Sequence, residues 1–247
     1  MSDVVALISA ARPDLDVRLA FLDLSAPSVE QVVDAIAAQG HTHAVVVPLL
    51  LGSAFHARID LPALLATART RHPHLHLTQA DVLAPDHRLI AALRDRALEA
   101  LASGDERSAS GARLRRIARD AHDGVPLGGT EPIGIAVAAV GSSSEAANSR
   151  TGWVARQLAA ATGWRTEICF ATTEPSVTEA VSRLRARGAG RILVAPWFLA
   201  PGLLTDRLAA GAPGLTHARV IGSHPALADI VWNRYDAALA ATLTLSA

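Results

Sequence analysis

The feature that most constrains this fold is an internal repeat. Residues 27–56 recur as residues 175–204 at a constant offset of 148. Pro27-Ser28-Val29 returns as Pro175-Ser176-Val177, and the apolar run at 44–51 returns at 192–199. After a small deletion the match resumes at an offset of 138, where residues 89–96 correspond to residues 227–234. This colinearity predicts one structural unit, used twice along the chain.

Each repeat alternates strands with helices. For repeat one the pattern predicts strands at 17–22, 45–51 and 75–79, and helices at 28–39, 62–70 and 88–101. Ser28 is a suitable N-cap for the first of these helices, and Gly40 is a suitable stop. The aliphatic run at 45–51 is typical of a strand that helices cover on both faces. The alternation therefore predicts an α/β fold with parallel sheets and right-handed crossovers.

The two repeats differ at their beginnings. Repeat two opens with an expected strand at 133–140, the turn Gly141-Ser142-Ser143-Ser144 and a helix at 148–162. Shifted back by 148, that strand and turn fall before Met1, so we expect repeat one to lack its first strand and to hold three parallel strands against four. An internal methionine taken as the start is the favoured explanation, and a natural chain without that strand is the alternative. The expected domains are 1–102 and 132–247, joined by a linker at 103–131 rich in Gly, Ser, Asp and Arg.

Composition excludes several classes of partner. Lys plus Arg and Asp plus Glu both number 23, so no global charge favours nucleic acid or an acidic membrane surface. The longest apolar stretches are strand-sized, far below the ~20 residues of a membrane helix. A single cysteine, Cys169, and no signal-peptide pattern after Met1 favour the cytoplasm. We expect no nucleic acid or membrane partner, and a monomer or homodimer.

Ligands of open parallel sheets bind at the carboxyl ends of the strands, which directs attention to the loops after Leu51 and Leu199. Only the first loop, at 52–62, carries an ionisable cluster, because Leu204 stands in repeat two where His56 stands in repeat one. The sequence therefore predicts that repeat one has a function at this loop that repeat two lacks.

These residues resemble the sirohydrochlorin chelatase family, also called class II chelatases. The resemblance is carried by Phe21-Leu22-Asp23, Val47-Pro48-Leu49-Leu50-Leu51, His56, Asp60-Leu61-Pro62, the stretch Asp81 to Asp86, and the loop Pro196 to Gly202. It implies two flavodoxin-like halves, related by a pseudo-twofold axis and facing each other across a cleft. It also implies an enzyme that inserts cobalt or iron, as a substrate and without an organic cofactor, into the tetrapyrrole sirohydrochlorin, in cobalamin or siroheme biosynthesis.

The resemblance assigns His56 as metal ligand and catalytic base. Neutral imidazole can bind a divalent metal and accept pyrrole protons near neutral pH. Asp60 could orient the ring or share the metal as an outer carboxylate. Gly141, Ser142 and Ser143 are candidate donors to substrate carboxylates, although such a turn is common in parallel α/β proteins that bind nothing there. Arg58 and Arg207 are further candidates for such contacts, and surface arginine is an equally good interpretation of both.

One departure from the family pattern leaves alternatives open. The family carries a second histidine in a His-Gly-Ser turn after its first strand, whereas this chain has Val140-Gly141-Ser142. A non-catalytic tetrapyrrole or metal carrier is therefore the main alternative. A regulatory or nucleotide-binding protein is a third, but no glycine-rich phosphate loop follows any expected strand.

The other chemically active side chains are interpreted more simply. His74 and His76 are expected on one face of a strand, as an adventitious metal site or, more simply, as solvated side chains. His41 and His43 are interpreted as surface residues at the opposite end of the sheet from His56. Cys169 is expected to pack in a buried strand.

Overall fold

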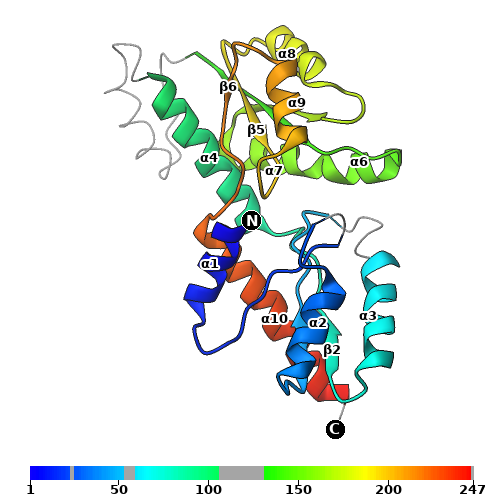
Figure 1. Ribbon diagram of the computed structural model, residues 1–247. Coiled ribbons are helices and arrows are strands. Elements are labelled where there is room, and N and C mark those ends of the chain that lie inside the picture. Colours follow the sequence, from blue (N-terminus) through cyan, green and yellow to red (C-terminus); the bar gives the residue numbers. More distant parts are fainter. Residues whose placement is uncertain (23–24, 53–58, 106–130, 246–247) are drawn as a thin grey trace. The chain divides into compact units, whose positions relative to one another are not determined.

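The computed structural model describes residues 1–22, 25–52, 59–105 and 131–245. The chain divides into two compact units, and each is described by itself. Unit 1 comprises residues 1–88 and 223–247, and unit 2 comprises residues 89–222. Both units are α/β structures built on a parallel sheet, as the alternating pattern predicts (Figure 1).

Unit 1 contains a sheet of two described strands. Its elements are α1 (Ser2–Ala11), α2 (Val29–Ala38), β1 (His43–Val46), α3 (Leu61–Arg71), β2 (His76–Gln79) and α10 (Pro225–Leu245). Helices α2 and α3 bury Val33 and Leu65 against the sheet, together with Leu77 of β2. Helix α10 also contacts both strands, and α1 packs on α10.

Unit 2 contains a four-stranded sheet in the order β4-β3-β5-β6. Its elements are α4 (His87–Asp105), β3 (Ile133–Ala139), α6 (Glu145–Thr151), α7 (Trp153–Thr162), β4 (Arg165–Phe170), α8 (Val177–Ala186), β5 (Arg191–Pro196), α9 (Leu203–Gly211) and β6 (Thr216–His217). Helices α8 and α9 cover one sheet face, where the small side chains of Ala136, Ala138 and Cys169 let α8 approach closely. Strand β3 is buried along almost its whole length, as expected of a central parallel strand.

The repeat found in the sequence is present in the structure. Helices α2 and α8 begin and end at positions 148 apart, and Ser28 and Ser176 cap them by accepting hydrogen bonds from the N3 backbone N–H. The strand pairing repeats as well, because Val45 lies opposite Thr78 in unit 1 just as Leu193 lies opposite Thr216 in unit 2. The pair β1 and β2 of unit 1 is therefore parallel and in the same register as the pair β5 and β6 of unit 2.

The expected strand at 17–22 is not formed, so the prediction of three strands in repeat one is wrong for the described residues. Only Phe21 forms a parallel bridge, to Ser28. The equivalent residues of repeat two form β4, which pairs with β3. The described sheet of unit 1 consists of β1 and β2, so in this part of the chain residues 17–22 have no strand beside them in the place that β3 takes beside β4.

Several expected boundaries also move. Strand β1 ends at Val46 instead of residue 51, because Pro48 has no N–H for the ladder and Leu50 donates to the carbonyl of Pro48 in a tight turn. The helix expected at 148–162 begins at Glu145 and is interrupted at Gly152, which separates α6 from α7. The proposed linker at 103–131 lies largely outside the described residues.

The compact units cut across the two repeats. Helix α4 follows β2 in the chain, yet most of it belongs to unit 2, and its counterpart α10 belongs to unit 1. Two equivalent arginines accompany this exchange. Arg96 of α4 donates from Nε and Nη2 to the carbonyl of Ile221, at 3.1 and 2.9 Å. Arg234 of α10 donates to the carbonyls of Val82 and Leu83, at 2.9 and 3.0 Å.

Candidate functional site

The turn after β3 forms the framework of the candidate site in unit 2. Gly141 has a φ of 93°, a conformation that side chains other than glycine rarely adopt. A Cβ at this position would lie 2.8 Å from Oγ1 of Thr172 and 2.9 Å from Cγ2 of Thr173. Glycine is therefore required both by its backbone conformation and by the close approach of the turn after β4.

Asn148 holds this turn in place. Its Oδ1 accepts the N–H of Ser142 at 2.9 Å, and its Nδ2 donates to the Ser142 carbonyl at 2.8 Å. The hydroxyl of Ser142 accepts the N–H of Ser144, and the hydroxyl of Ser144 caps α6. In the described part of the chain, the N–H of Ser143 has no hydrogen-bond partner and is available to a ligand.

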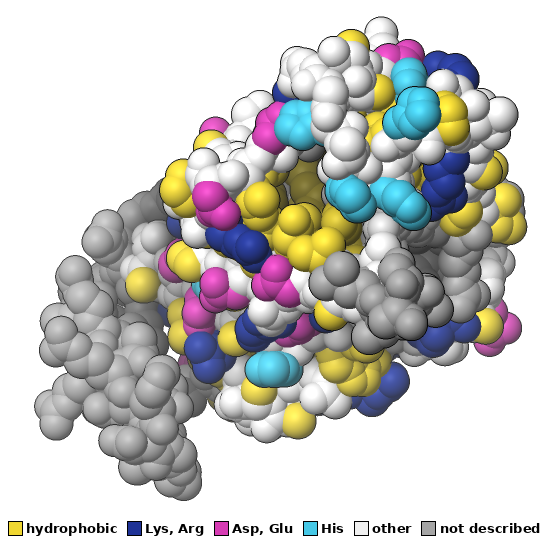
Figure 2. Space-filling model, turned by 90° about the horizontal axis from the view of Figure 1, so that it is seen from below, with side chains coloured by type: hydrophobic (Ala, Val, Ile, Leu, Met, Phe, Trp, Pro, Cys, Tyr) yellow, Lys and Arg dark blue, Asp and Glu magenta, His cyan; other side chains and the backbone are white. Residues whose placement is uncertain are grey.

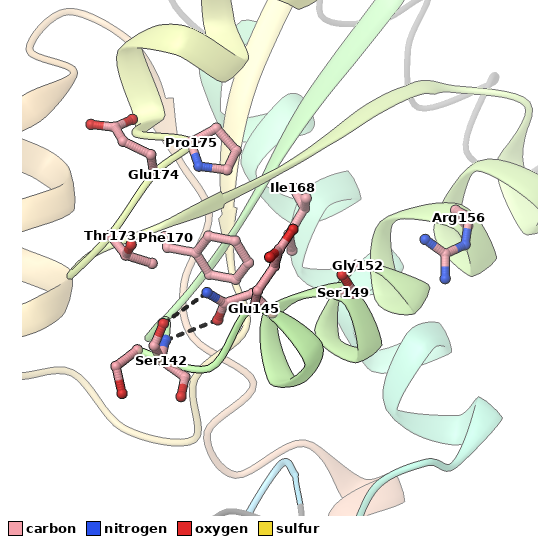
Figure 3. Close-up of a pocket in the computed structure, with 12 residues that line it drawn as sticks. Ser142, Glu145, Ser149, Gly152, Arg156, Ile168, Phe170, Thr173, Glu174 and Pro175 are labelled. Carbon is pink, nitrogen blue, oxygen red and sulfur yellow. Dashed lines mark hydrogen bonds between the residues drawn. The ribbon is translucent and has the colours of Figure 1, made fainter.

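A cavity of about 510 Å³ lies beside this turn (Figure 3). Its volume is within the ~300–1,000 Å³ typical of small-molecule sites. The lining comes from the turn and α6, from the start of α7, and from β4 with the turn that follows it: Ser142, Ser143, Glu145, Asn148, Ser149, Gly152, Arg156, Ile168, Phe170, Thr173, Glu174 and Pro175. The cavity thus combines hydroxyl groups, an aromatic ring and charged groups of both signs.

The charged groups of the cavity differ in whether other groups of the protein already bind them. Glu174 accepts the N–H of Ser176 at the start of α8. Glu145 and Arg156 form no ion pair within the described residues, although both line the cavity. An uncommitted guanidinium and several hydroxyls can bind a carboxylate, whereas Glu145 would repel one placed beside it.

Exposed apolar side chains lie near the same ends of the strands. Val140, directly after β3, is 45% exposed, and Leu203, at the start of α9, is 87% exposed. Since β3 and β5 are neighbours in the sheet, the chain presents large apolar side chains after two adjacent strands. An apolar ligand face could pack there.

In unit 1 a buried carboxylate lies in the loop that follows β2. The N–H of Leu83 donates to the Leu50 carbonyl at 3.1 Å, which ties the loop after β2 to the segment after β1. Asp86, only 9% exposed, ends this loop and accepts hydrogen bonds from the backbone and guanidinium of Arg88. The Arg88 guanidinium, with a smaller contribution from Arg234, holds the pKa of Asp86 below its usual value, and burial opposes this only partly.

The structure brings together some of the predicted site residues. Ser142 and Ser143 line one cavity, and Gly141 forms the turn beside it. Arg207 is exposed on α9 and does not line that cavity. Asp60 is half-buried at the start of α3. His56 and Arg58 lie outside the described residues.

Sequence reasoning missed the groups that complete the cavity. Asn148, Arg156 and Glu174 lie on α6, α7 and the turn after β4, and no spacing in the sequence links them. The sequence shows Asp86 as part of the stretch from Asp81 to Asp86 but does not indicate that its carboxylate is buried. No group of three or more His, Cys, Asp or Glu among the described residues is arranged to hold a metal ion. In the same part of the chain no helix is long and apolar enough to span a bilayer.

Three curated relatives illustrate what the chain is similar to. It is 28% identical to the sirohydrochlorin cobaltochelatase of Priestia megaterium over 207 residues, which is 81% of this chain and 60% of the relative. The chain thus spans less than two thirds of that relative's length. It is 24% identical to the sirohydrochlorin ferrochelatase of the same organism, over 92% of this chain and 80% of the relative. A ferrochelatase of Bacillus subtilis matches at 33% identity over 32% of this chain and 30% of the relative.

Solved structures support the fold assignment. SirB from Bacillus subtilis with Fe³⁺ superposes with a TM-score of 0.65 at 24% identity, covering 95% of this chain and 88% of that one. CbiX, described as the terminal enzyme for siroheme biosynthesis in denitrifying bacteria, gives 0.60 at 19% identity, covering 95% and 89%. The sequence profile of the CbiX family matches residues 1–100 and 134–238. Because this match covers most of both repeats, the chain belongs to the CbiX family of sirohydrochlorin chelatases.

Proposed function

We propose that this protein is a sirohydrochlorin chelatase that inserts a divalent metal ion, cobalt or iron, into the tetrapyrrole. The observation that carries the proposal is the CbiX match over both repeats, which includes the loop with His56. Relatives named for cobalt and for iron insertion both match, so the family alone does not choose the metal. Imidazole binds both ions, so the type of ligand does not distinguish cobalt from iron.

In this proposal His56 is the reactive group. Metal insertion needs a ligand that releases its ion to the macrocycle and a base that accepts the pyrrole N–H protons. A neutral imidazole suits both tasks near neutral pH. Asp60, at the start of α3 and four residues after His56, would orient the imidazole through a hydrogen bond.

The polar cavity of unit 2 is proposed to hold carboxylates of the substrate. The free N–H of Ser143, the hydroxyls that line the cavity and the uncommitted guanidinium of Arg156 are donors suited to that task. Arg58 and Arg207 are proposed as additional carboxylate partners. Arg207 is exposed and forms no ion pair within the described residues, which leaves its guanidinium available.

The apolar faces of the macrocycle need apolar contacts. Val140 and Leu203 provide exposed apolar surface after neighbouring strands. Burying such side chains under a ligand contributes roughly 25 cal/mol for each Å² removed from water. We therefore place the tetrapyrrole over the carboxyl end of the unit 2 sheet, with its carboxylates directed toward the cavity.

A turnover assay separates this function from the carrier alternative, which the lack of a histidine in the Val140-Gly141-Ser142 turn favours. Sirohydrochlorin in large excess over protein is mixed with Co²⁺ or Fe²⁺ under anaerobic conditions, and its absorbance is followed. A chelatase converts many equivalents at a rate proportional to protein concentration. A carrier changes the spectrum by one equivalent and stops, and that result would overturn the proposal.

A further inference from the structure

Two histidines at the amino end of the unit 1 sheet are paired across neighbouring strands. His43 is the first residue of β1 and His76 is the first residue of β2, and the two are register partners. Their rings stack with centroids 5.5 Å apart and an interplanar angle of 9°. Because register partners on adjacent parallel strands point to the same sheet face, the backbone itself holds these two imidazoles together.

Their hydrogen bonds leave ring nitrogens available. Oγ1 of Thr42 lies 3.0 Å from Nδ1 of His43, a contact that engages this nitrogen and leaves Nε2 free. The ring of His76 has no hydrogen-bond partner in the described part of the chain. The carbonyl of Thr42 accepts the N–H of His76 at 2.8 Å, which anchors the two strand starts to each other. Both histidines are exposed.

Other histidines gather at the same end of unit 1, and two of them are already engaged by carboxylates. His41 lies 3.5 Å from Asp16, and His72 lies 2.6 Å from Asp34. Figure 2 shows histidine side chains gathered on this face. The stacked pair differs from these neighbours, because no carboxylate of the described residues contacts its ring nitrogens.

We propose that His43 and His76 form a two-histidine site for a divalent transition-metal ion, with water completing the coordination. Imidazole is a preferred ligand of zinc, copper, nickel and iron. Metal–nitrogen bonds of about 2.0–2.1 Å require the two ring nitrogens to come within about 4 Å of each other. The exposed rings reach this separation from the stack by rotating about their side-chain torsions, without moving the strands.

This site is independent of the proposed chelatase function. His43 and His76 lie at the amino ends of their strands, whereas His56 follows the carboxyl end of β1. A closed structural site has four protein ligands, and no group of three or more possible ligands among the described residues surrounds a metal position. The site therefore binds its ion reversibly, from solution.

The test uses the full chain and Ni²⁺ alone, followed by isothermal titration. His56→Ala serves as the starting protein, because it removes the other proposed metal ligand. Adding His43→Ala or His76→Ala should each weaken the remaining binding at least about tenfold, since removing either ligand breaks the chelate. The protein with both replacements should bind Ni²⁺ no more weakly than the protein with either single replacement. His74→Ala, an exposed histidine at the same end, is the matched control.

Each outcome decides the proposal. Loss of binding in both single variants, with His74→Ala unchanged, supports the paired site. Binding unchanged by His43→Ala or by His76→Ala overturns it, and so does equal weakening by His74→Ala, which would show adventitious binding to surface histidines. Far-ultraviolet circular dichroism checks the fold. Sirohydrochlorin turnover in His43→Ala and His76→Ala proteins that retain His56 should stay unchanged, so failure of this site and failure of the chelatase proposal are separable.

Discussion

Replacing Arg96 of α4 tests the exchange of terminal helices between the repeats. Arg96 is 8% exposed and donates two hydrogen bonds to the carbonyl of Ile221, which is fully buried. Arg96→Met keeps most of the side-chain volume but removes the donors and leaves that carbonyl unpaired. Hydrogen bonds to charged groups contribute about 1.5–3 kcal/mol, so we expect a loss of about 3 kcal/mol in the free energy of unfolding.

That loss is large enough to measure. For a protein of this size each kcal/mol lowers the melting temperature by roughly 2–4 °C, which predicts a shift of about 6–12 °C. Arg94→Met is the matched control on the same helix. Its side chain is 34% exposed and, among the described residues, pairs with the neighbouring Asp95 alone. Such an exposed ion pair contributes about 0–1 kcal/mol, so its melting temperature should change little.

Hydrogen exchange shows which unit each arginine stabilises. The N–H of Ile221 is bonded to the Phe198 carbonyl in unit 2, and the N–H of Leu83 is bonded to the Leu50 carbonyl in unit 1. Arg96→Met should speed exchange at Ile221, and Arg234→Met should speed exchange at Leu83. If each helix instead packed within its own repeat, Arg96→Met would speed exchange at Leu83 and Arg234→Met would speed exchange at Ile221. That reversal, or an Arg96→Met effect no larger than that of Arg94→Met, would refute the exchange.

Three further predictions concern single side chains. Gly141→Ala should cost about 1–3 kcal/mol in unfolding free energy, measured by urea denaturation, because its backbone has a positive φ and the new Cβ would meet Thr172; an unchanged midpoint would contradict this. Burial raises the pKa of the Cys169 thiol to about 12, so the native protein should resist thiol reagents at pH 8 and react only when denatured; rapid native labelling would contradict it. Asp86→Asn should destabilise unit 1 by about 3 kcal/mol near pH 7. Since the pKa of Asp86 is lowered by Arg88, its ionised form stabilises the fold above the unfolded pKa of about 3.9, and calorimetry should show the difference shrinking as pH falls below that value; a difference that persists at pH 2 would contradict this.

The elements that the sequence predicted well are those whose signals are local. Ser28 and Ser176 accept backbone hydrogen bonds at the starts of α2 and α8, and a serine before an apolar helical pattern is a recognisable N-cap. The offset of 148 carried this information from one repeat to the other. The serine N-cap and the repeat offset therefore each supported the same prediction of where α2 and α8 begin.

The sequence could not predict features that depend on distant partners. Residues 17–22 have strand-like composition but pair with no strand among the described residues, and composition alone does not show whether a partner strand is present. The apolar face of α4 is visible in the sequence, but periodicity does not say which sheet that face will cover. The burial of Arg96 against Ile221, 125 residues away, depends on where α4 packs, so the sequence could not predict it either.

The candidate site shows the same division. The turn at Gly141, Ser142 and Ser143 was visible, because a glycine-serine turn between a buried strand and a helix is a local pattern. Asn148 and Arg156 complete the cavity from separate helices, and nothing local identifies them. The pairing of His43 with His76 required the strand register, which sets the two side by side although they are 33 residues apart.

The most direct test of the account is the initial rate of metal insertion by the His56→Ala protein. Sirohydrochlorin absorbance is followed with Co²⁺ and with Fe²⁺, and circular dichroism confirms that the variant is folded. His74→Ala, an exposed histidine of the same repeat, is the control and should keep the wild-type rate. We predict that His56→Ala abolishes insertion of the metal that the wild-type protein uses. A His56→Ala protein that keeps the wild-type rate with both metals would contradict the assignment of His56.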